Sequence, residues 1–424
     1  MKNILIAIRS IFKKGRHNVM KIVSLGIGLA VGLVLIAKVY FEQSYDDFYP
    51  DRDRVYQVWA KYQQNGGELK DYPQTSGGIA PTMQQQIPEI ETVTRYTSFG
   101  DWTFTMTDTK MKYSGRCIIA DSCFFDILPR PMLIGNAKEV LSTPMYVLIS
   151  SRIAKNIGGD VIGKNFTVDN SPGRTMTIGG VFEEVPENSH SRYDVIVSMA
   201  SAGRFMWEGS PTNMLGNDRY ISYVKLHKGV NPLALEEQVR TFVNSYFPPE
   251  EQQKVGLSID FSFHKLDNLH KELPQVKRMT WILSLLAFAL IFTAVMNYIL
   301  IVISSIVNRS KEVAVHKCYG ASENNIHGMM FGEALVHIVL SLILALLLIL
   351  AFRGTVEELL ATSLDSLLLS NGSLVLLGIC ILVFFVSGFM PGSLYARIPV
   401  ASAFRNYREN KRIWKKALLL VQFV

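Results

Sequence analysis

Four long apolar stretches constrain this chain more than any other feature of its sequence. An α-helix needs about 20 consecutive apolar residues to cross the hydrocarbon core of a bilayer, because only then are its backbone groups satisfied within an apolar segment. Stretches of this kind occupy residues 22–41, 280–307, 329–352 and 373–390, and a fifth, residues 414–424, is too short to span. The sequence therefore predicts a membrane α-helical bundle with four complete transmembrane helices and the start of a fifth.

The distribution of lysine and arginine predicts the orientation of these helices, because cytoplasmic flanks collect positive charge. Residues 1–21 carry six lysines and arginines and no acid, and residues 391–416 carry seven with one glutamate. These two flanks contribute +12 to a chain whose net charge is +7, so the pI of 9.0 reflects membrane orientation and does not indicate a nucleic-acid partner. We expect a multi-pass protein of the bacterial inner membrane with a cytoplasmic N-terminus.

This orientation assigns a compartment to each segment between the spans. The basic segments 1–21 and 391–413 are expected in the cytoplasm, together with the loop 308–328. The segment 42–278 and the short loop 353–372 are expected outside. Because the segment 42–278 is long enough to bury its own core, the sequence predicts a large extracytoplasmic domain between the first and second spans.

The sequence of the segment 42–278 predicts an α+β domain. Alternating apolar and polar residues over 103–115 and 174–185 are typical of half-buried strands. Residues 81–91 and 231–247 have the pattern of helices. The segment contains no G-x-S-x-G motif and no His or Cys spacing of the catalytic or metal-binding kind, so no catalytic residue is expected.

The stretch GGDVIGKN, residues 158–165, has the G-x-x-x-x-G-K spacing that opens a phosphate-binding loop. Such a loop needs Ser or Thr after the lysine, because that hydroxyl completes the Mg²⁺ shell. Here Asn165 follows Lys164, and the predicted topology places the stretch outside, away from ATP. We therefore expect no nucleotide site in this chain.

The candidate reactive side chains outside the membrane are few. His190 lies in a polar loop, and a solvated or structural role is favoured over catalysis. Cys117 and Cys123 could form a short-loop disulfide in an oxidising compartment, but we favour two buried free thiols. Cys318 and Cys380 are interpreted as packing residues.

The cytoplasmic loop carries the most specific local pattern. Charged and apolar residues alternate along residues 308–328, which predicts a helix lying against the cytoplasmic membrane face, whereas an ordinary polar turn is the alternative. Val313 and Val315 are expected on the side that faces the membrane, and Gly320 is expected to end the helix. The charged side chains expected to meet a partner are Arg309, Lys311, Glu312, His316 and Lys317.

Polar residues inside the predicted spans are candidates for a role within the membrane. Glu333 and His337 are four residues apart on one helical face, and Asn297 lies in the inner half of the second span. A proton or metal relay is one interpretation, but we favour hydrogen bonds between neighbouring helices. Lys38, near the outer end of the first span, is expected to extend its ammonium group to the membrane surface.

Residues 297–321, NYILIVISSIVNRSKEVAVHKCYGA, resemble a segment of the MacB/FtsX-like permeases of ABC transporters. The resemblance rests on an Asn and an aromatic residue at the end of the span, followed by R-x-K-E-[IV]-x-[IV]-[RH]-K-x-x-G-A. Ala314 stands where the family usually has Gly, and His316 where it frequently has Arg. Further stretches similar to the family's extracytoplasmic core domain are residues 46–60, 124–136, 145–168 and 177–198.

The resemblance implies a permease subunit that holds no cofactor or metal, while a separate cytoplasmic ABC ATPase dimer binds ATP and Mg²⁺. That ATPase would press on the helix at residues 308–321, and movement of the spans would rearrange the external domain to export or release an envelope substrate. A periplasmic adaptor or an outer-membrane channel is a further expected partner. The alternative is a regulator of the same build that does not transport, but activates a cell-wall hydrolase or a signalling kinase.

Residues 403–424 repeat the plan of residues 10–31, in which a basic amphipathic stretch leads into an apolar one. This repeat resembles the long two-repeat branch of the family, whose second half starts in a similar way. We expect the partner inside the membrane to be a second permease half of the same natural chain or a homodimer mate.

Overall fold

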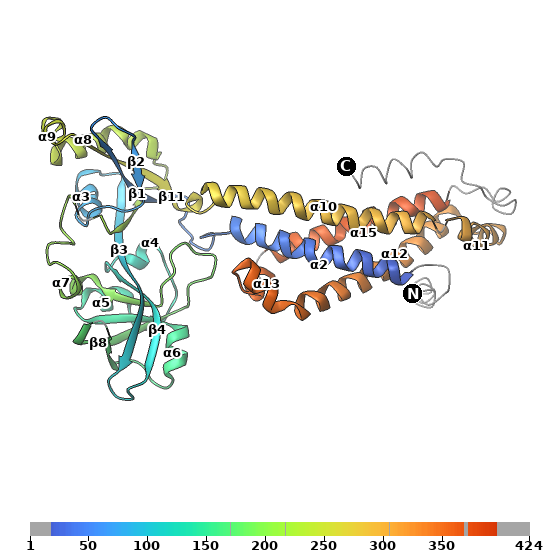
Figure 1. Ribbon diagram of the computed structural model, residues 1–424, viewed down its shortest axis with the longest axis horizontal. Coiled ribbons are helices and arrows are strands. Elements are labelled where there is room, and N and C mark those ends of the chain that lie inside the picture. Colours follow the sequence, from blue (N-terminus) through green and yellow to red (C-terminus); the bar gives the residue numbers. More distant parts are fainter. Residues whose placement is uncertain (1–17, 170, 217, 305, 369–371, 397–424) are drawn as a thin grey trace. The chain divides into compact units, whose positions relative to one another are not determined.

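The computed structural model describes residues 18–169, 171–216, 218–304, 306–368 and 372–396 (Figure 1). The chain divides into two compact units, one formed by residues up to Gln43 and from Pro274 onward, and the other by Ser44–Leu273. We describe the two units separately.

The first unit is a bundle of long apolar helices and short connecting ones. Its described helices are α2 (Asn18–Gln43), α10 (Pro274–Ser304), α11 (Ile306–Cys318), α12 (Glu323–Ala351), α13 (Arg353–Leu360), α14 (Leu364–Leu368) and α15 (Ser373–Ala396). By length and composition, α2, α10 and α12 are able to cross a membrane, and α15 contains a shorter apolar stretch, Leu374–Val383, within the described residues. The stub at 414–424 and the basic segments 1–17 and 397–413 lie outside the described residues.

Three glycines of α2 allow its neighbours to approach closely. A side chain at Gly28 would collide with Ala294 of α10, and one at Gly32 would collide with Ile291 of the same helix. On another side of α2, a Cβ at Gly26 would lie 2.9 Å from Leu344 Cδ2 of α12. Small residues at helix interfaces in membranes let backbones pack tightly without a hydrophobic driving force. The sequence of α2 thus sets its packing against both α10 and α12, which run beside it (Figure 1).

The second unit is an α+β domain built on one mixed sheet. Among its described residues the main strand order is β11-β1-β10-β3-β4-β9-β6-β8-β5, while β2 pairs with β1, and β7 pairs with β3 and β8. The strands are β1 (Val55–Gln64), β2 (Lys70–Tyr72), β3 (Ile90–Met106), β4 (Lys112–Ala120), β5 (Met132–Ile134), β6 (Tyr146–Ser150), β7 (Asn165–Val168), β8 (Ser171–Phe182), β9 (Val195–Ser198), β10 (Ile221–Leu226) and β11 (Leu257–Lys265).

Short helices accompany the sheet, and the buried apolar residues of the domain form three clusters, which we call lobes. The helices are α3 (Ile79–Gln86), α4 (Phe124–Ile127), α5 (Ala137–Ser142), α6 (Ser151–Ile157), α7 (Ala202–Phe205), α8 (Glu236–Tyr246) and α9 (Pro249–Val255). The 17-residue strand β3 joins the lobes, because its first part pairs with β10 and its second part with β4 and β7.

Some local predictions for this domain agree with the structure, and two need a correction. The predicted helix at 81–91 is only partly right, because α3 ends at Gln86 and strand β3 begins at Ile90. The predicted helix at 231–247 corresponds to a 3₁₀ turn at Pro232–Leu235 followed by α8. The predicted strand at 103–115 is instead the tip of a hairpin, in which β3 ends, the chain turns, and β4 begins. Lys110 takes a positive φ of 57° in this turn, a local reversal that the alternation of side chains could not reveal.

Candidate functional site

The first part of the predicted cytoplasmic segment 308–328 lies in helix α11, and its last six residues already belong to α12. Gly320 ends α11 as expected. Gly320 has a φ of +84°, its N–H donates to Lys317 O at 3.0 Å, and the Ala321 N–H donates to His316 O at 3.0 Å. This pair of bonds is a Schellman motif, which satisfies the last carbonyls of a helix when glycine adopts the left-handed conformation. Ser322 then caps α12, so a single tight turn connects the two helices.

The two valines of α11 do not lie on the same side, which corrects the sequence prediction. Val313 and Ala314 are buried in the apolar cluster of the bundle, whereas Val315 is 43% exposed. Residues two positions apart on an α-helix project about 200° apart, so Val313 and Val315 cannot share a face. Ala314 takes the buried position, and at this site the family usually has the still smaller glycine.

The exposed surface of α11 contains an aromatic residue that the charge pattern did not single out. Tyr319 is 89% exposed directly before the terminal glycine, and His316 and Cys318 are exposed beside it. Glu312 and Lys317 are half-buried. The side chains of Arg309 and Lys311 lie outside the described residues. Tyrosine is enriched among the residues that contribute most to binding at protein interfaces. A tyrosine within the predicted contact segment was therefore the feature of the sequence that could have identified Tyr319.

Polar contacts connect α2, α10 and α12 inside the bundle. Tyr298 Oη of α10 lies 3.2 Å from His337 Nδ1 of α12, and both side chains are buried. One turn further along α12, Ser341 Oγ lies 3.1 Å from Ile22 O of α2. Glu333 is buried next to this set and Asn297 is half-buried. The His337 contact is of the interhelical kind that we favoured over a relay, and Tyr298 was not predicted.

Lys38 does not extend to the membrane surface, contrary to the prediction. Its Nζ lies 2.6 Å from Glu42 Oε1, and the two side chains are only 8% and 6% exposed. The same Nζ donates to Thr362 Oγ1 at 2.7 Å. A carboxylate one helical turn away pairs with the ammonium group, so the lysine remains buried at the outer end of α2.

In the external domain, the segment that follows α2 and the segment that precedes α10 are tied to each other. We call residues 44–54 the inbound segment and residues 265–273 the outbound segment. Tyr45 stacks on His270 with ring centroids 3.4 Å apart. Lys271 Nζ lies 3.2 Å from Asp47 Oδ1 and 3.0 Å from Asp267 Oδ1. Burial alone would raise the pKa of Asp267, but the hydrogen bond from Lys271 and the positive charges of Lys271, Arg52 and Lys265 together hold that pKa below its usual value.

A buried polar cluster ties the inbound segment to the loop before β9. Asp46 is fully buried with a φ of 60°, and its carboxylate accepts from Ser189 Oγ at 2.9 Å and lies 2.6 Å from His190 Nδ1. His190 Nε2 contacts Tyr223 Oη and lies 3.1 Å from Ser191 Oγ. His190 is therefore structural, as favoured, and it anchors residues 186–194 to the chain that leaves α2.

The order Ser191, His190 and Asp46 superficially matches the hydrogen-bond order of a hydrolase triad. However, Ser191 is buried, and its Oγ lies 2.7 Å from Tyr96 Oη. Burial raises the pKa of Tyr96 to about 12, so this tyrosine is neutral at physiological pH. A buried hydroxyl within such a network cannot reach a substrate, so the cluster supports the fold.

The remaining candidates occupy ordinary structural positions. The Gly163 N–H donates to Ile178 O at 2.8 Å, and Asn165 begins strand β7, whereas a phosphate-binding loop would lead into a helix. Cys117 and Cys123 are both free thiols, and burial raises the pKa of Cys117 well above its usual value. No group of three or more His, Cys, Asp or Glu side chains able to hold a metal ion occurs among the residues that the structure describes.

Comparison with known proteins shows the class of this chain. Residues 20–242 match the MacB-like periplasmic core domain, and residues 284–400 match the FtsX-like permease C-terminal domain. The chain therefore belongs to the MacB/FtsX-like family of ABC transporter permeases. It is a membrane protein of the inner membrane with a large periplasmic domain, as the sequence predicted, and the family implies an ATPase partner.

Three solved structures are similar to about half of this chain. They are a domain of a protein described as a permease from Porphyromonas gingivalis (33% identity, TM-score 0.47), the periplasmic region of MacB from Actinobacillus actinomycetemcomitans (15%, 0.33) and the extracellular domain of the noncanonic ABC-type transporter YknZ from Gram-positive bacteria (11%, 0.34). They cover 51%, 49% and 48% of this chain, which in turn covers 91%, 87% and 98% of theirs. No curated protein matches the chain.

Proposed function

We propose that this permease subunit transmits force from a separate cytoplasmic ABC ATPase dimer to its periplasmic domain, so that ATP hydrolysis exports or releases an envelope substrate. The ATPase contacts the exposed side of α11, where His316 and Tyr319 lie about one turn apart, and the family pattern adds Arg309, Lys311, Glu312 and Lys317. ATP and Mg²⁺ are held by that partner.

The observation that carries this proposal is the tie between the inbound and outbound segments. The chain passes directly from α2 into the inbound segment and from the outbound segment into α10. The stacked pair Tyr45–His270 and the ion pair Lys271–Asp47 join those two segments. In the bundle, the close contact of Gly28 and Gly32 with α10 holds the two helices together. A displacement of this helix pair is therefore passed on through two connected chain segments.

The proposed topology keeps the four spans of the sequence prediction, with the N-terminus and α11 in the cytoplasm. The fourth span corresponds to residues 373–390 within α15. A second permease half or a second copy of the chain completes the assembly. Cys318, exposed next to Tyr319, is a native reporter of this orientation.

The orientation is tested by labelling a Cys123→Ser variant in whole cells with a membrane-impermeant thiol reagent. We expect no modification of Cys318 in intact cells and full modification after the inner membrane is permeabilised. Modification in intact cells would place α11 outside and contradict the topology. A Cys318→Ser variant identifies the labelled site.

The force-transmission proposal is tested by purifying the chain with its ATPase and measuring both association and function. Lys317→Glu together with Tyr319→Ala should weaken ATPase capture. Asp267→Asn removes the ion pair between Arg52 of the inbound segment and Asp267 of the outbound segment, whose Nε and Oδ1 lie 3.6 Å apart. This variant should leave capture intact and uncouple ATP hydrolysis from transport or release. Normal function of the Asp267 variant would contradict the role of the tie between the inbound and outbound segments. Recovery of a cell-wall hydrolase or a signalling kinase as the dependent activity, with no transported substrate, would favour the regulator alternative.

A further inference from the structure

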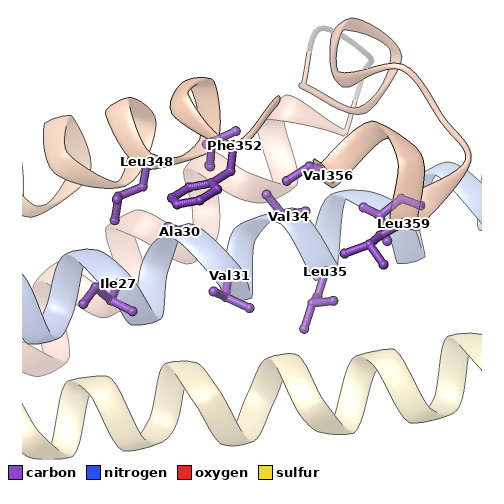
Figure 2. A pocket seen from close by; sticks show the side chains of 11 residues that line it. Ile27, Ala30, Val31, Val34, Leu35, Leu348, Phe352, Val356 and Leu359 are labelled. Carbon is purple, nitrogen blue, oxygen red and sulfur yellow. The ribbon is translucent and has the colours of Figure 1, made fainter. Parts of the chain in front are cut away.

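An apolar pocket of about 380 Å³ lies between α2, α12 and α13 (Figure 2). All of its 11 lining side chains are hydrocarbon, from Ile27–Leu35 on α2, from the end of α12 and from α13. Figure 2 shows Val356 of α13 opposite Val34 of α2, and the Phe352 ring extending toward α2. A pocket without a polar group on its wall can bind only an apolar group, because an unpaired polar ligand atom would be desolvated without compensation.

The side chains of this chain leave the pocket open. Leu359 is 78% exposed and Phe352 is 60% exposed, and Ile27 and Val31 on the opposite wall are also exposed. Exposed apolar surface of this kind is stable only when hydrocarbon covers it. Since α2 and α12 are membrane-spanning helices, the surrounding lipid is the hydrocarbon at hand.

The short helix α13 indicates the depth of the pocket in the bilayer. Its apolar side chains Val356, Leu359 and Leu360 line the pocket, while Arg353 and Glu358 are exposed. Charged side chains are excluded from the hydrocarbon centre, so this amphipathic helix marks the outer membrane surface. The pocket therefore opens at the level of the outer-leaflet acyl chains.

The charges beside the pocket favour one headgroup chemistry. Arg353 is already paired, with Nε 2.9 Å from Glu357 Oε1 and Nη2 3.1 Å from Asp365 Oδ2. Glu358 is exposed, and residues 353–365 carry three carboxylates but only one guanidinium, so this rim has a net negative charge. An acidic rim attracts a headgroup with a free ammonium group and repels an anionic one.

We propose that this pocket binds one acyl chain of a phospholipid of the outer leaflet, with an amine headgroup of the phosphatidylethanolamine type at the acidic rim of α13. The inference does not depend on the proposed force transmission. It assigns a lipid to a defined place against α2, the helix that continues into the periplasmic domain.

Native mass spectrometry of the full-length protein released from bilayer nanodiscs of equal phosphatidylethanolamine and phosphatidylglycerol tests the site. The wild-type chain should retain one phosphatidylethanolamine. Leu359→Trp and Val31→Phe place larger side chains in the pocket and take up space that the acyl chain would occupy. Each should lower the retention of the lipid about tenfold, because the acyl chain loses buried apolar contacts. The matched control is Leu347→Trp, which changes an exposed α12 residue outside the pocket wall and should retain the lipid.

A second variant tests the headgroup assignment in the same measurement. Glu358→Lys should still retain a lipid, but the ratio of bound phosphatidylglycerol to bound phosphatidylethanolamine should rise. We expect a rise of about fivefold for each unit of charge changed near the surface, and this substitution changes two units. Equal retention in the wild type and in Leu359→Trp would overturn the site. An interchain cross-link formed by Leu359→Cys would also overturn it, because a helix of another chain would then occupy the pocket. An unchanged preference in Glu358→Lys would overturn the amine headgroup.

Discussion

The buried pair Lys38–Glu42 makes a quantitative prediction about the outer end of α2. Replacing Lys38 by Met leaves the Glu42 carboxylate in a site where its side chain is only 6% exposed. Removing one partner of a buried ion pair typically costs 3–5 kcal/mol, because the remaining buried charge loses that partner's attraction. The carboxylate can take up a proton, so we expect a cost for Lys38→Met of about 3 kcal/mol, at the lower end of that range.

The two companion variants should be much milder. Glu42→Gln keeps an acceptor for Lys38, which also retains Thr362 Oγ1 at 2.7 Å, so a cost of about 1–2 kcal/mol is expected. The double variant Lys38→Met/Glu42→Gln has no buried charge left, and its cost should be about 1 kcal/mol. The double-mutant cycle should therefore give a coupling energy of about 3–4 kcal/mol.

Unfolding of the purified full-length chain in one detergent, monitored by intrinsic fluorescence, measures the cycle. Thr362→Val is the matched control, since it removes the hydroxyl contact and leaves the ion pair. If Lys38→Met is no more destabilising than the double variant, the carboxylate is not desolvated and the structural interpretation is wrong.

Three further predictions concern glycine packing in the bundle, the end of helix α11 and the tie between the inbound and outbound segments. Gly28→Leu should lower the free energy of unfolding by about 3 kcal/mol or more, because the added side chain is overpacked against α10. Gly378→Leu is the control, since a Cβ at Gly378 meets no atom within 4 Å, and it should be neutral in the same unfolding assay. Equal effects of the two variants would refute the close approach of α2 and α10. Gly320→Val should strain the left-handed turn by about 2 kcal/mol and reduce ATPase capture, while Gly320→Asn should be tolerated; normal capture with Val would show that this turn is not part of the contact. Because the folded-state pKa of Asp267 is depressed, its stabilising pair with Lys271 is present above the usual carboxyl pKa of 3.8 and is lost as the pH falls below it. Thermal unfolding of the wild type should therefore weaken below about pH 4, and Asp267→Asn should flatten that dependence, whereas parallel profiles would refute this assignment.

The sequence predicts the features that depend on local rules. The apolar stretches 22–41, 280–307 and 329–352 correspond to α2, α10 and α12, because membrane spans must be apolar over their whole length. Gly320 was recognised as a helix end, since the left-handed residue of a Schellman motif is usually glycine. The amphipathic pattern at 231–247 predicted α8, because apolar residues at helical spacing form one face that is buried against the core.

Two errors arose where the surroundings decide the position of a side chain. Val315 was expected to share the membrane-facing side of the helix with Val313, although a helix rotates about 100° per residue and places the two residues on different sides. Lys38 was assigned to the membrane surface because such lysines usually extend outward, but Glu42 and Thr362 provide a buried pair. The second contact comes from a residue 324 positions away.

The interactions that the sequence could not predict connect distant positions. Asp46 and His190 are 144 residues apart, and Tyr298 and His337 are 39 residues apart on different helices. Neither hydrophobic periodicity nor a motif spacing contains information about such pairs. Only the folded arrangement shows that Asp46, which lies just after α2, holds the loop before β9.

The central claim, that ATP-driven motion reaches the periplasmic domain through the spans, is tested most directly by a distance measurement. Spin labels on Lys155→Cys in α6 and Glu250→Cys in α9 report the separation of two parts of the domain, in a background without native cysteines. In the reconstituted complex with its ATPase, Mg²⁺–ATP should shift the distance distribution, and Gly320→Val should abolish that shift. No shift in the unmodified complex, or an equal shift in the Gly320 variant, would contradict force transmission through α11 and the spans.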